Sequence, residues 1–222
     1  MLFLAVLCGF LAELELEHKI EKKREKVYMK SLLADLRKDT SLYTAFVTSN
    51  KGVYIMIDSL ILYMGDPDRQ LHINKLYYWS RMISIKLKFL FPVERTYEEM
   101  KSSGYLRLIR SGPVADSVSH YYNSLISLYK YNDVGLEWAA DYVRSTGKIF
   151  DAGIHFKILK EGKEQNAETI GFLTKDPITI NELLSSAQYI YGALRQAEGV
   201  VVKRNQTAQT LIELITKKYH LE

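Results

Sequence analysis

Residues 32–64 read LLADLRKDTSLYTAFVTSNKGVYIMIDSLILYM, and this stretch decides the fold class. Several of its positions step by seven residues, namely Leu36, Tyr43, Asn50, Ile57 and Met64. Such spacing is typical of a helix that packs along one continuous seam. Turn residues follow directly, as Gly65-Asp-Pro-Asp68, and they end the pattern. We therefore predict one long helix that runs from the N-terminal region to about Met64.

Similar periodicity recurs in the rest of the chain. We predict further long helices over residues 73–90, 113–155 and 179–215, and a short helix that is closed by Gly104. Two segments match capping boxes, Thr96-Tyr-Glu-Glu99 and Thr179-Ile-Asn-Glu182, in which a threonine starts a helix. Helices with one apolar stripe bury it by packing against one another. The predicted fold is all-α, a long-helix antiparallel bundle of four main helices plus one short helix.

The first twelve residues, MLFLAVLCGFLA, are entirely apolar. A helix needs about 20 apolar residues to cross a bilayer, so we interpret residues 1–12 as part of a transmembrane helix whose beginning is missing. Three alternatives stay open: a secretory signal peptide, a lipoprotein acylated at Cys8, and a terminal helix buried in a soluble bundle. The predicted organisation is a partial transmembrane segment over 1–12, a charged juxtamembrane helix over 13–30 continuous with the bundle, and a bundle domain over 31–222.

Composition supports one folded domain without a nucleic-acid role. The chain has 222 residues, of which 47% are hydrophobic and 25% charged, and its net charge is +4. Acidic and basic residues are interspersed, so no patch indicates nucleic acid. The only cysteine, Cys8, excludes an intramolecular disulfide and a thiolate zinc site. Basic residues between Lys19 and Lys26 would place the bundle in the cytoplasm by the positive-inside rule, but that rule compares both flanks, so the orientation stays open.

Polar residues interrupt three of the predicted seams at Asn50, Asn132 and Asn205. Asparagines at seam positions commonly fix the register of packed helices, at some expense in stability. The alternative is that the three side chains meet in a polar pocket that binds a small molecule. We favour the structural role and keep the pocket as the alternative function.

Candidate metal ligands and catalytic residues are sparse. Asp116/His120 and Asp151/His155 each place a carboxylate and an imidazole one helical turn apart, a spacing that suits a metal ion or a simple surface pair. Glu15-Leu-Glu-His18 occurs once, whereas a di-iron bundle needs two such motifs. No phosphate-binding loop, nucleophile elbow or His-Glu-x-x-His motif is present. We predict no catalytic residue, cofactor or metal, and no enzymatic activity.

Three segments together resemble an uncharacterised family of bacterial single-pass membrane proteins, a domain of unknown function. They are Lys22-Lys-Arg-Glu-Lys26, Tyr28-Met-Lys-Ser-Leu-Leu-Ala-Asp-Leu36 and Thr96-Tyr-Glu-Glu-Met-Lys-Ser-Ser-Gly-Tyr-Leu-Arg-Leu-Ile109, and a helix with paired tyrosines at Tyr121 and Tyr122 follows. The resemblance implies an N-terminal transmembrane helix that begins before Met1, and it brings no known activity. Within the third segment, Ser102, Ser103 and Gly104 either close a helix or offer donors to an anion.

These observations predict a membrane-anchored helical interaction or sensory module. Its expected partners are the lipid bilayer and, through the long helices, a second copy of the chain or another protein.

Overall fold

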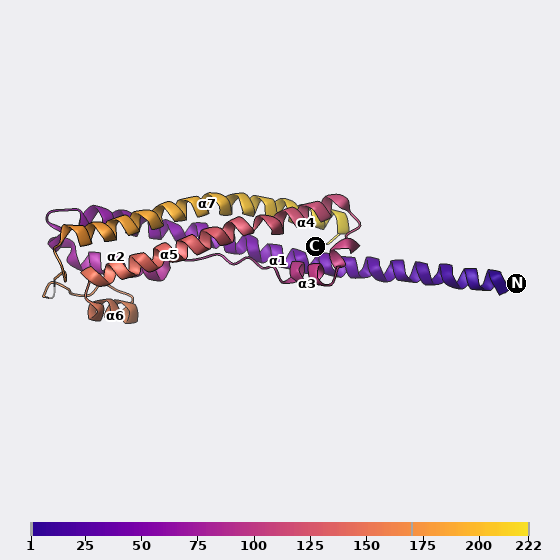
Figure 1. The fold of residues 1–222 in the computed structure, drawn as a ribbon, viewed down its shortest axis with the longest axis horizontal. Coiled ribbons are helices and arrows are strands. Elements are labelled where there is room, and N and C mark those ends of the chain that lie inside the picture. The colour runs from indigo at the N-terminus through magenta and orange to yellow at the C-terminus, as the bar shows by residue number, and fades with distance from the viewer. Residues whose placement is uncertain (1, 170, 222) are drawn as a thin grey trace. The chain divides into compact units, whose positions relative to one another are not determined.

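The computed structural model describes residues 2–169 and 171–221, and all regular structure in this part of the chain is helical (Figure 1). The elements in chain order are α1 (Leu2–Met64), η1 (Arg69–His72), α2 (Ile73–Lys86), α3 (Arg95–Ser102), η2 (Tyr105–Leu108), α4 (Gly112–Ser124), α5 (Ile126–Ile149), α6 (Ala152–Glu161) and α7 (Pro177–Tyr219). No strand occurs among the described residues. The prediction of an all-helical bundle is confirmed.

Helix α1 ends where the sequence predicted, at Met64. Asp66 forms the turn that follows, because its Oδ1 accepts the backbone N–H of Asp68 at 2.8 Å and Pro67 does not continue the helix. Gly52 lies inside α1 without interrupting it. The seam positions Leu36, Ile57 and Met64 are fully buried, as their spacing requires.

The single helix predicted over residues 113–155 is wrong, because the structure divides it into α4, α5 and α6. Asp151 makes the second break: it has extended backbone, and its Oδ1 accepts the N–H of Ile154 at 3.0 Å. An aspartate that caps N–H groups in this way starts a new helix. At the first break, the Ser124 hydroxyl donates to the Tyr121 carbonyl, and such local bonds compete with the helical ladder.

Both predicted capping boxes are also wrong. Thr96 lies inside α3, where its N–H and its hydroxyl both donate to the Asp35 carboxylate, over 3.2 and 2.5 Å. Asp176, not Thr179, caps α7, since its Oδ2 accepts the Thr179 N–H at 2.8 Å. In each case an aspartate carboxylate, and not the threonine hydroxyl, accepts a backbone N–H at the start of the helix. Helix α2 ends at Lys86, short of the predicted residue 90.

The chain forms two compact units, each with its own apolar core. Unit 1 comprises the residues up to Tyr43, Pro92–Ile126 and the residues from Lys203 onward. Its buried core draws on α1, α3, α4 and α7, with Met29, Leu32, Leu36, Met100, Val114, Val118, Leu211 and Ile215 all essentially inaccessible to solvent. Packing these stripes together is what holds the helices of unit 1 side by side.

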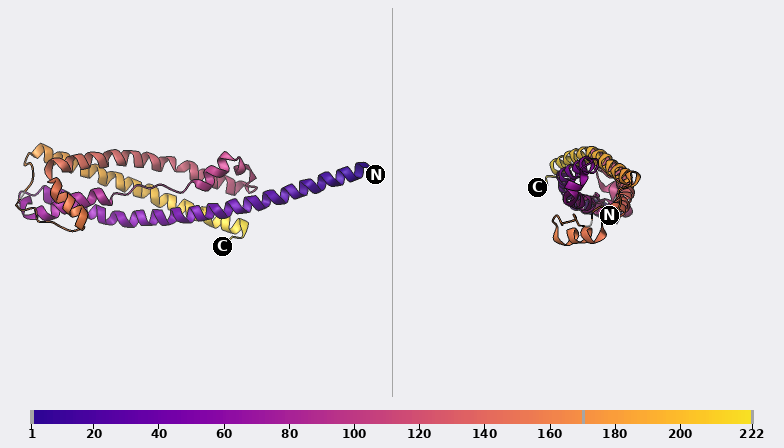
Figure 2. Two further views of the ribbon diagram at one scale, coloured as in Figure 1. Left: turned by 90° about the horizontal axis from the view of Figure 1, so that it is seen from below. Right: turned by 90° about the vertical axis from the view of Figure 1, so that its left-hand side faces the viewer.

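Unit 2 comprises Thr44–Phe91 and Ser127–Val202. Its core is built from later turns of α1 and from α2, α5, α6 and the first part of α7, and includes Val53, Ile57, Leu60, Leu76, Ile83, Leu128, Ile158, Leu183 and Val201. Helix α6 lies against α2, and Figure 2 shows α6 on the outside of the unit.

Within unit 1, the start of α1 extends beyond α3, α4 and the end of α7 (Figures 1 and 2). Its apolar side chains are exposed: Phe3 to 78%, Val6 to 67% and Phe10 to 58%. The interpretation of this run as a helix buried in a bundle core is therefore wrong for the described part of the chain. Among the described residues, no helix combines the length and the apolar character needed to cross a membrane.

Candidate functional site

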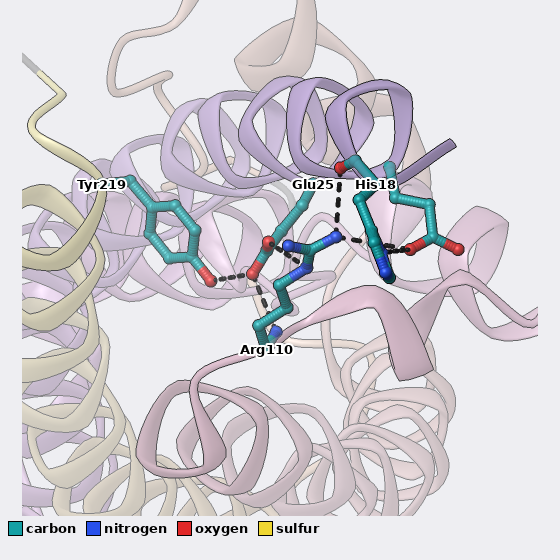
Figure 3. Close-up of polar contacts among 5 residues, drawn as sticks. His18, Glu25, Arg110 and Tyr219 are labelled. Atoms are coloured by element: carbon teal, nitrogen blue, oxygen red, sulfur yellow. Dashed lines mark hydrogen bonds and ion pairs between the residues drawn. The ribbon is translucent and has the colours of Figure 1, made fainter. Parts of the chain in front are cut away.

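A buried carboxylate lies where the exposed start of α1 meets the rest of unit 1. Glu25 is 4% exposed, an unusual position for a glutamate unless it is paired. Its Oε1 accepts the backbone N–H of Arg110 at 2.8 Å and the hydroxyl of Tyr219 at 2.5 Å. Figure 3 shows these two groups reaching Glu25 from separate parts of the chain.

The Arg110 side chain extends the cluster toward the N-terminus. Its Nε lies 3.9 Å from Glu25 Oε2, and its Nη2 donates to the His18 carbonyl at 3.1 Å and to Glu21 Oε2 at 3.3 Å (Figure 3). One guanidinium thus contacts two turns of α1, which its planar fork of donors allows.

Tyr219 comes from the last turn of α7. Burial and the neighbouring Glu25 carboxylate raise the pKa of Tyr219 above its ordinary value, so the phenol stays protonated and donates a hydrogen bond to Glu25. We call Glu25, Arg110 and Tyr219 the Glu25 cluster. It joins α1, the segment after η2 and the end of α7, so the base of the exposed helix is held on two sides.

Two grooves flank the Glu25 cluster. One is lined by residues 15–22 of α1 together with Arg107, Leu108 and Arg110. The other has a volume of about 520 Å³ and is lined by Lys22, Glu25, Lys26, Arg110, Ser111, Lys218, Tyr219 and His220. We call the second the Lys22–Lys218 groove. Basic side chains predominate in its lining.

A second buried acidic cluster lies further along α1. Asp35 and Asp39 are one helical turn apart and both are fully buried. Asp39 accepts the Val93 N–H and the Tyr121 hydroxyl, each at 2.7 Å. Asp35 accepts hydrogen bonds from the N–H and the hydroxyl of Thr96. The exposed Arg95 guanidinium lies 3.6 Å from Asp35 Oδ1. The two carboxylates therefore fix Val93 and the first turn of α3 onto α1.

Burial raises the pKa of Asp39 to about 6, and the adjacent Asp35 and Glu94 add to the rise. Hydrogen bonds from Tyr121 and Val93 act in the opposite direction, because they stabilise the charged form. Tyr121 also shares a 2.9 Å hydrogen bond with the Tyr43 hydroxyl. Burial raises the pKa of both tyrosines, so the cluster is a chain of protonated phenols ending on a carboxylate.

His155, one of the predicted metal-ligand candidates, is part of an aromatic core in unit 2. Its Nε2 shares a 3.0 Å hydrogen bond with Ser80 Oγ, and its ring packs against Tyr77 and Phe150. Burial lowers the pKa of His155 to about 4, so the ring is neutral at pH 7. Its predicted partner Asp151 instead caps α6.

The other predicted pair lies on an open surface of unit 1. Asp116 and His120 line an open groove between α4 and α7 in unit 1, together with Lys203, Thr207 and other α7 residues. Within residues 2–169 and 171–221, no three His, Cys, Asp or Glu side chains are grouped closely enough to hold a metal ion. The hydroxyls of Ser102 and Ser103 both donate to the Glu99 carbonyl, a contact that favours helix closure over anion binding there.

The three seam asparagines differ from one another. Asn132 binds the backbone of Leu90 in both directions, accepting its N–H at 3.3 Å and donating to its carbonyl at 2.6 Å. Asn50 is fully buried in unit 2, and neither of its amide atoms has a hydrogen-bond partner among the described residues. Asn205 belongs to unit 1. The contacts of Asn132 support the structural interpretation for that residue.

Sequence reasoning missed the Glu25 cluster entirely, because its members lie 85 and 194 positions from Glu25 along the chain. The aspartates left a detectable signal. Asp35 and Asp39 fall within the apolar stripe of Leu32, Leu36 and Tyr43, where charged residues are rarely found unless paired.

Comparison of the chain with known protein families gave no match, and neither characterised proteins nor solved structures showed a significant similarity.

Proposed function

We propose that this protein is a membrane-anchored helical module that serves interaction or sensing rather than catalysis. In this proposal the apolar start of α1 inserts into a bilayer, and the Glu25 cluster holds the inserted helix at a fixed position on unit 1. The resemblance to single-pass membrane proteins noted in the sequence agrees with this assignment.

The observation that carries the proposal is the exposure of the apolar side chains at the start of α1. Phe3, Leu4, Val6, Phe10 and Leu11 are each more than half exposed. Fully burying one such side chain contributes about 1.5–3 kcal/mol, so a helix apolar on every side gains most by leaving water. The hydrocarbon core of a bilayer would cover all faces of this apolar helix at once.

The charges that follow support the same location. Lys19, Lys22, Lys23, Arg24 and Lys26 lie on the next turns of α1. Basic residues beside a membrane segment are attracted to anionic lipid, with about 1 kcal/mol for each one near the surface.

Self-association is the second part of the proposal. Leu16, Ile20 and Val27 are 58%, 43% and 58% exposed, and their spacing of four and seven residues places them on one side of α1. A second copy of the chain, held in the same membrane, would cover this stripe. Analytical ultracentrifugation in neutral detergent measures the oligomeric state directly. A protein that stays monomeric at all concentrations would refute self-association.

Flotation with liposomes tests the anchoring. We expect the intact protein to float with phosphatidylcholine vesicles and the double variant Phe3→Lys/Phe10→Lys to lose at least tenfold in the bound fraction, because charged side chains are costly in a bilayer. The matched control is Leu62→Lys/Leu71→Lys, which changes side chains that are 68% and 81% exposed elsewhere. Equal loss in both variants, or an intact protein that stays with the soluble fraction, would contradict anchoring.

Protease treatment of intact and lysed cells then identifies the side of the membrane. Cleavage of the bundle only after lysis would place it in the cytoplasm, whereas cleavage once the outer barrier alone is opened would place it outside the inner membrane.

A further inference from the structure

Basic side chains outnumber acidic ones among the described residues that line the Lys22–Lys218 groove. Among the described residues that line it, Glu25 alone carries a carboxylate, and the Arg110 guanidinium and the Tyr219 hydroxyl already engage it. Among the described residues, no carboxylate oxygen lies within 4 Å of the ammonium groups of Lys22, Lys26 or Lys218. Three lysines that line one concavity without acidic partners create a positive potential that attracts an anion.

The groove offers neutral donors and sufficient space as well. Ser111 contributes a half-buried hydroxyl, which donates to an anion without adding charge. A volume of about 520 Å³ falls within the usual range of small-molecule sites. Ammonium groups and hydroxyls together suit a phosphate, whose several oxygens accept from several donors.

If the apolar run is membrane-inserted as proposed, the lysines of the groove lie within reach of the headgroup layer. Lys22 follows the last residue of the apolar run, Ala12, by ten positions on the same helix, a rise of about 15 Å. The headgroup layer covers about 5–8 Å of that distance, tilting of the helix shortens it, and the flexible lysine stems extend toward the interface.

We infer that the Lys22–Lys218 groove binds the phosphate of an anionic lipid headgroup. This inference rests on the proposed membrane anchoring for the lipid source, whereas the phosphate chemistry rests on the groove alone. In the membrane, the bound headgroup neutralises Lys22 of α1 and Lys218 in the last turn of α7. It thereby joins α1 to α7 in addition to the hydrogen bond between Glu25 and Tyr219.

The test compares two double variants of the intact protein. Lys22→Gln/Lys218→Gln removes two charges from the groove, and Lys23→Gln/Lys30→Gln removes two exposed charges from α1 outside it. Each is measured with vesicles of phosphatidylcholine alone and of phosphatidylcholine with phosphatidylglycerol at a ratio of three to one. A third measurement titrates glycerol 3-phosphate into the protein in neutral detergent, followed by NMR.

We expect the intact protein to prefer the phosphatidylglycerol vesicles. The groove variant should lose that preference by more than tenfold, whereas the control, which removes Lys23 beside the membrane, should lose it by no more than about fivefold through general surface charge. Equal losses in both variants would refute headgroup binding in the groove, because general surface charge would then explain the preference for anionic vesicles. Binding to both vesicle types alike would overturn it while leaving anchoring intact. Saturable glycerol 3-phosphate binding without any vesicle binding would refute anchoring and the lipid source, and would keep only the phosphate chemistry.

Discussion

Tyr121 donates a 2.7 Å hydrogen bond to the carboxylate of Asp39, and both side chains are fully buried. This contact joins α4 to α1 inside unit 1, and the Tyr43 hydroxyl meets the Tyr121 hydroxyl at 2.9 Å. A buried carboxylate in an apolar core is costly unless such donors are present. The pair therefore specifies which turn of α4 faces which turn of α1.

Removing the Tyr121 hydroxyl should destabilise the protein. We expect Tyr121→Phe to lower the free energy of unfolding by about 1–3 kcal/mol, because Asp39 loses a donor in a buried setting. Urea denaturation followed by circular dichroism measures the change. The control is Tyr122→Phe, since the buried Tyr122 hydroxyl has no hydrogen-bond partner among the described residues. That control should be neutral or slightly stabilising, and an equal loss in both variants would argue against the specific contact.

Asp39 should make stability depend on pH in a defined direction. Its pKa is about 6 in the folded protein against an ordinary 3.8, so the folded state binds the proton more readily. Its stabilising contribution is complete below pH 4 and declines as the pH rises through 6. One pKa unit corresponds to about 1.4 kcal/mol, so Asp39→Asn should gain about 2–3 kcal/mol relative to the wild type between pH 4 and pH 7.5.

Urea midpoints of the wild type and Asp39→Asn at several pH values measure this difference. Asp58→Asn, which changes an exposed aspartate, controls for the general effect of removing a charge. A constant difference between wild type and Asp39→Asn across the whole range would show that Asp39 does not titrate as described.

The Glu25 cluster should hold the end of α7 in place. Tyr219→Phe removes the 2.5 Å hydrogen bond to Glu25, and bonds to charged groups contribute about 1.5–3 kcal/mol. We expect faster hydrogen exchange of the backbone amides in the last two turns of α7, measured by mass spectrometry. Tyr189→Phe is the control, because Tyr189 is 60% exposed. Unchanged exchange near Tyr219 would remove the cluster as a connection between α7 and α1.

Two of the seam asparagines, Asn132 and Asn50, should respond to substitution in opposite ways. Asn132→Ala leaves both backbone groups of Leu90 without their partner, which should cost about 2–4 kcal/mol in thermal or urea unfolding. Asn50→Leu replaces a fully buried amide that lacks partners and should stabilise by about 1–3 kcal/mol. A destabilised Asn50→Leu would mean that the amide has a role that the contacts of unit 2 do not explain.

Much of the helical framework follows from periodicity alone. The extent of α1 and the existence of α7 were correctly predicted, because an apolar position every three to four residues leaves a helix as the simplest way to form one stripe. The breaks within residues 113–155 were missed because the seam continues across them. Only the local bond of Ser124 and the cap at Asp151 reveal where each helix ends.

The capping boxes failed for a related reason. Thr96 matched the local motif, but Asp35, 61 positions away, accepts both of its hydrogens. A local pattern contains no information about an acceptor that arrives through tertiary packing. The same holds for Glu25: its charge in the sequence fits a solvated helix, and its contacts with Arg110 and Tyr219 arise only through tertiary packing.

The unbroken helix at the start of the chain has a mechanical consequence. Glu25 follows Ala12 by thirteen positions within α1, about 20 Å and three and a half turns. Because the helix is continuous over this stretch, each residue of the apolar run keeps a fixed angular position around the helix axis relative to Glu25. A twist applied at one end reaches the other as a twist of similar angle. Each inserted residue would rotate the apolar run relative to Glu25 by about 100°. This stretch of helix therefore transmits rotation as well as fixing a distance.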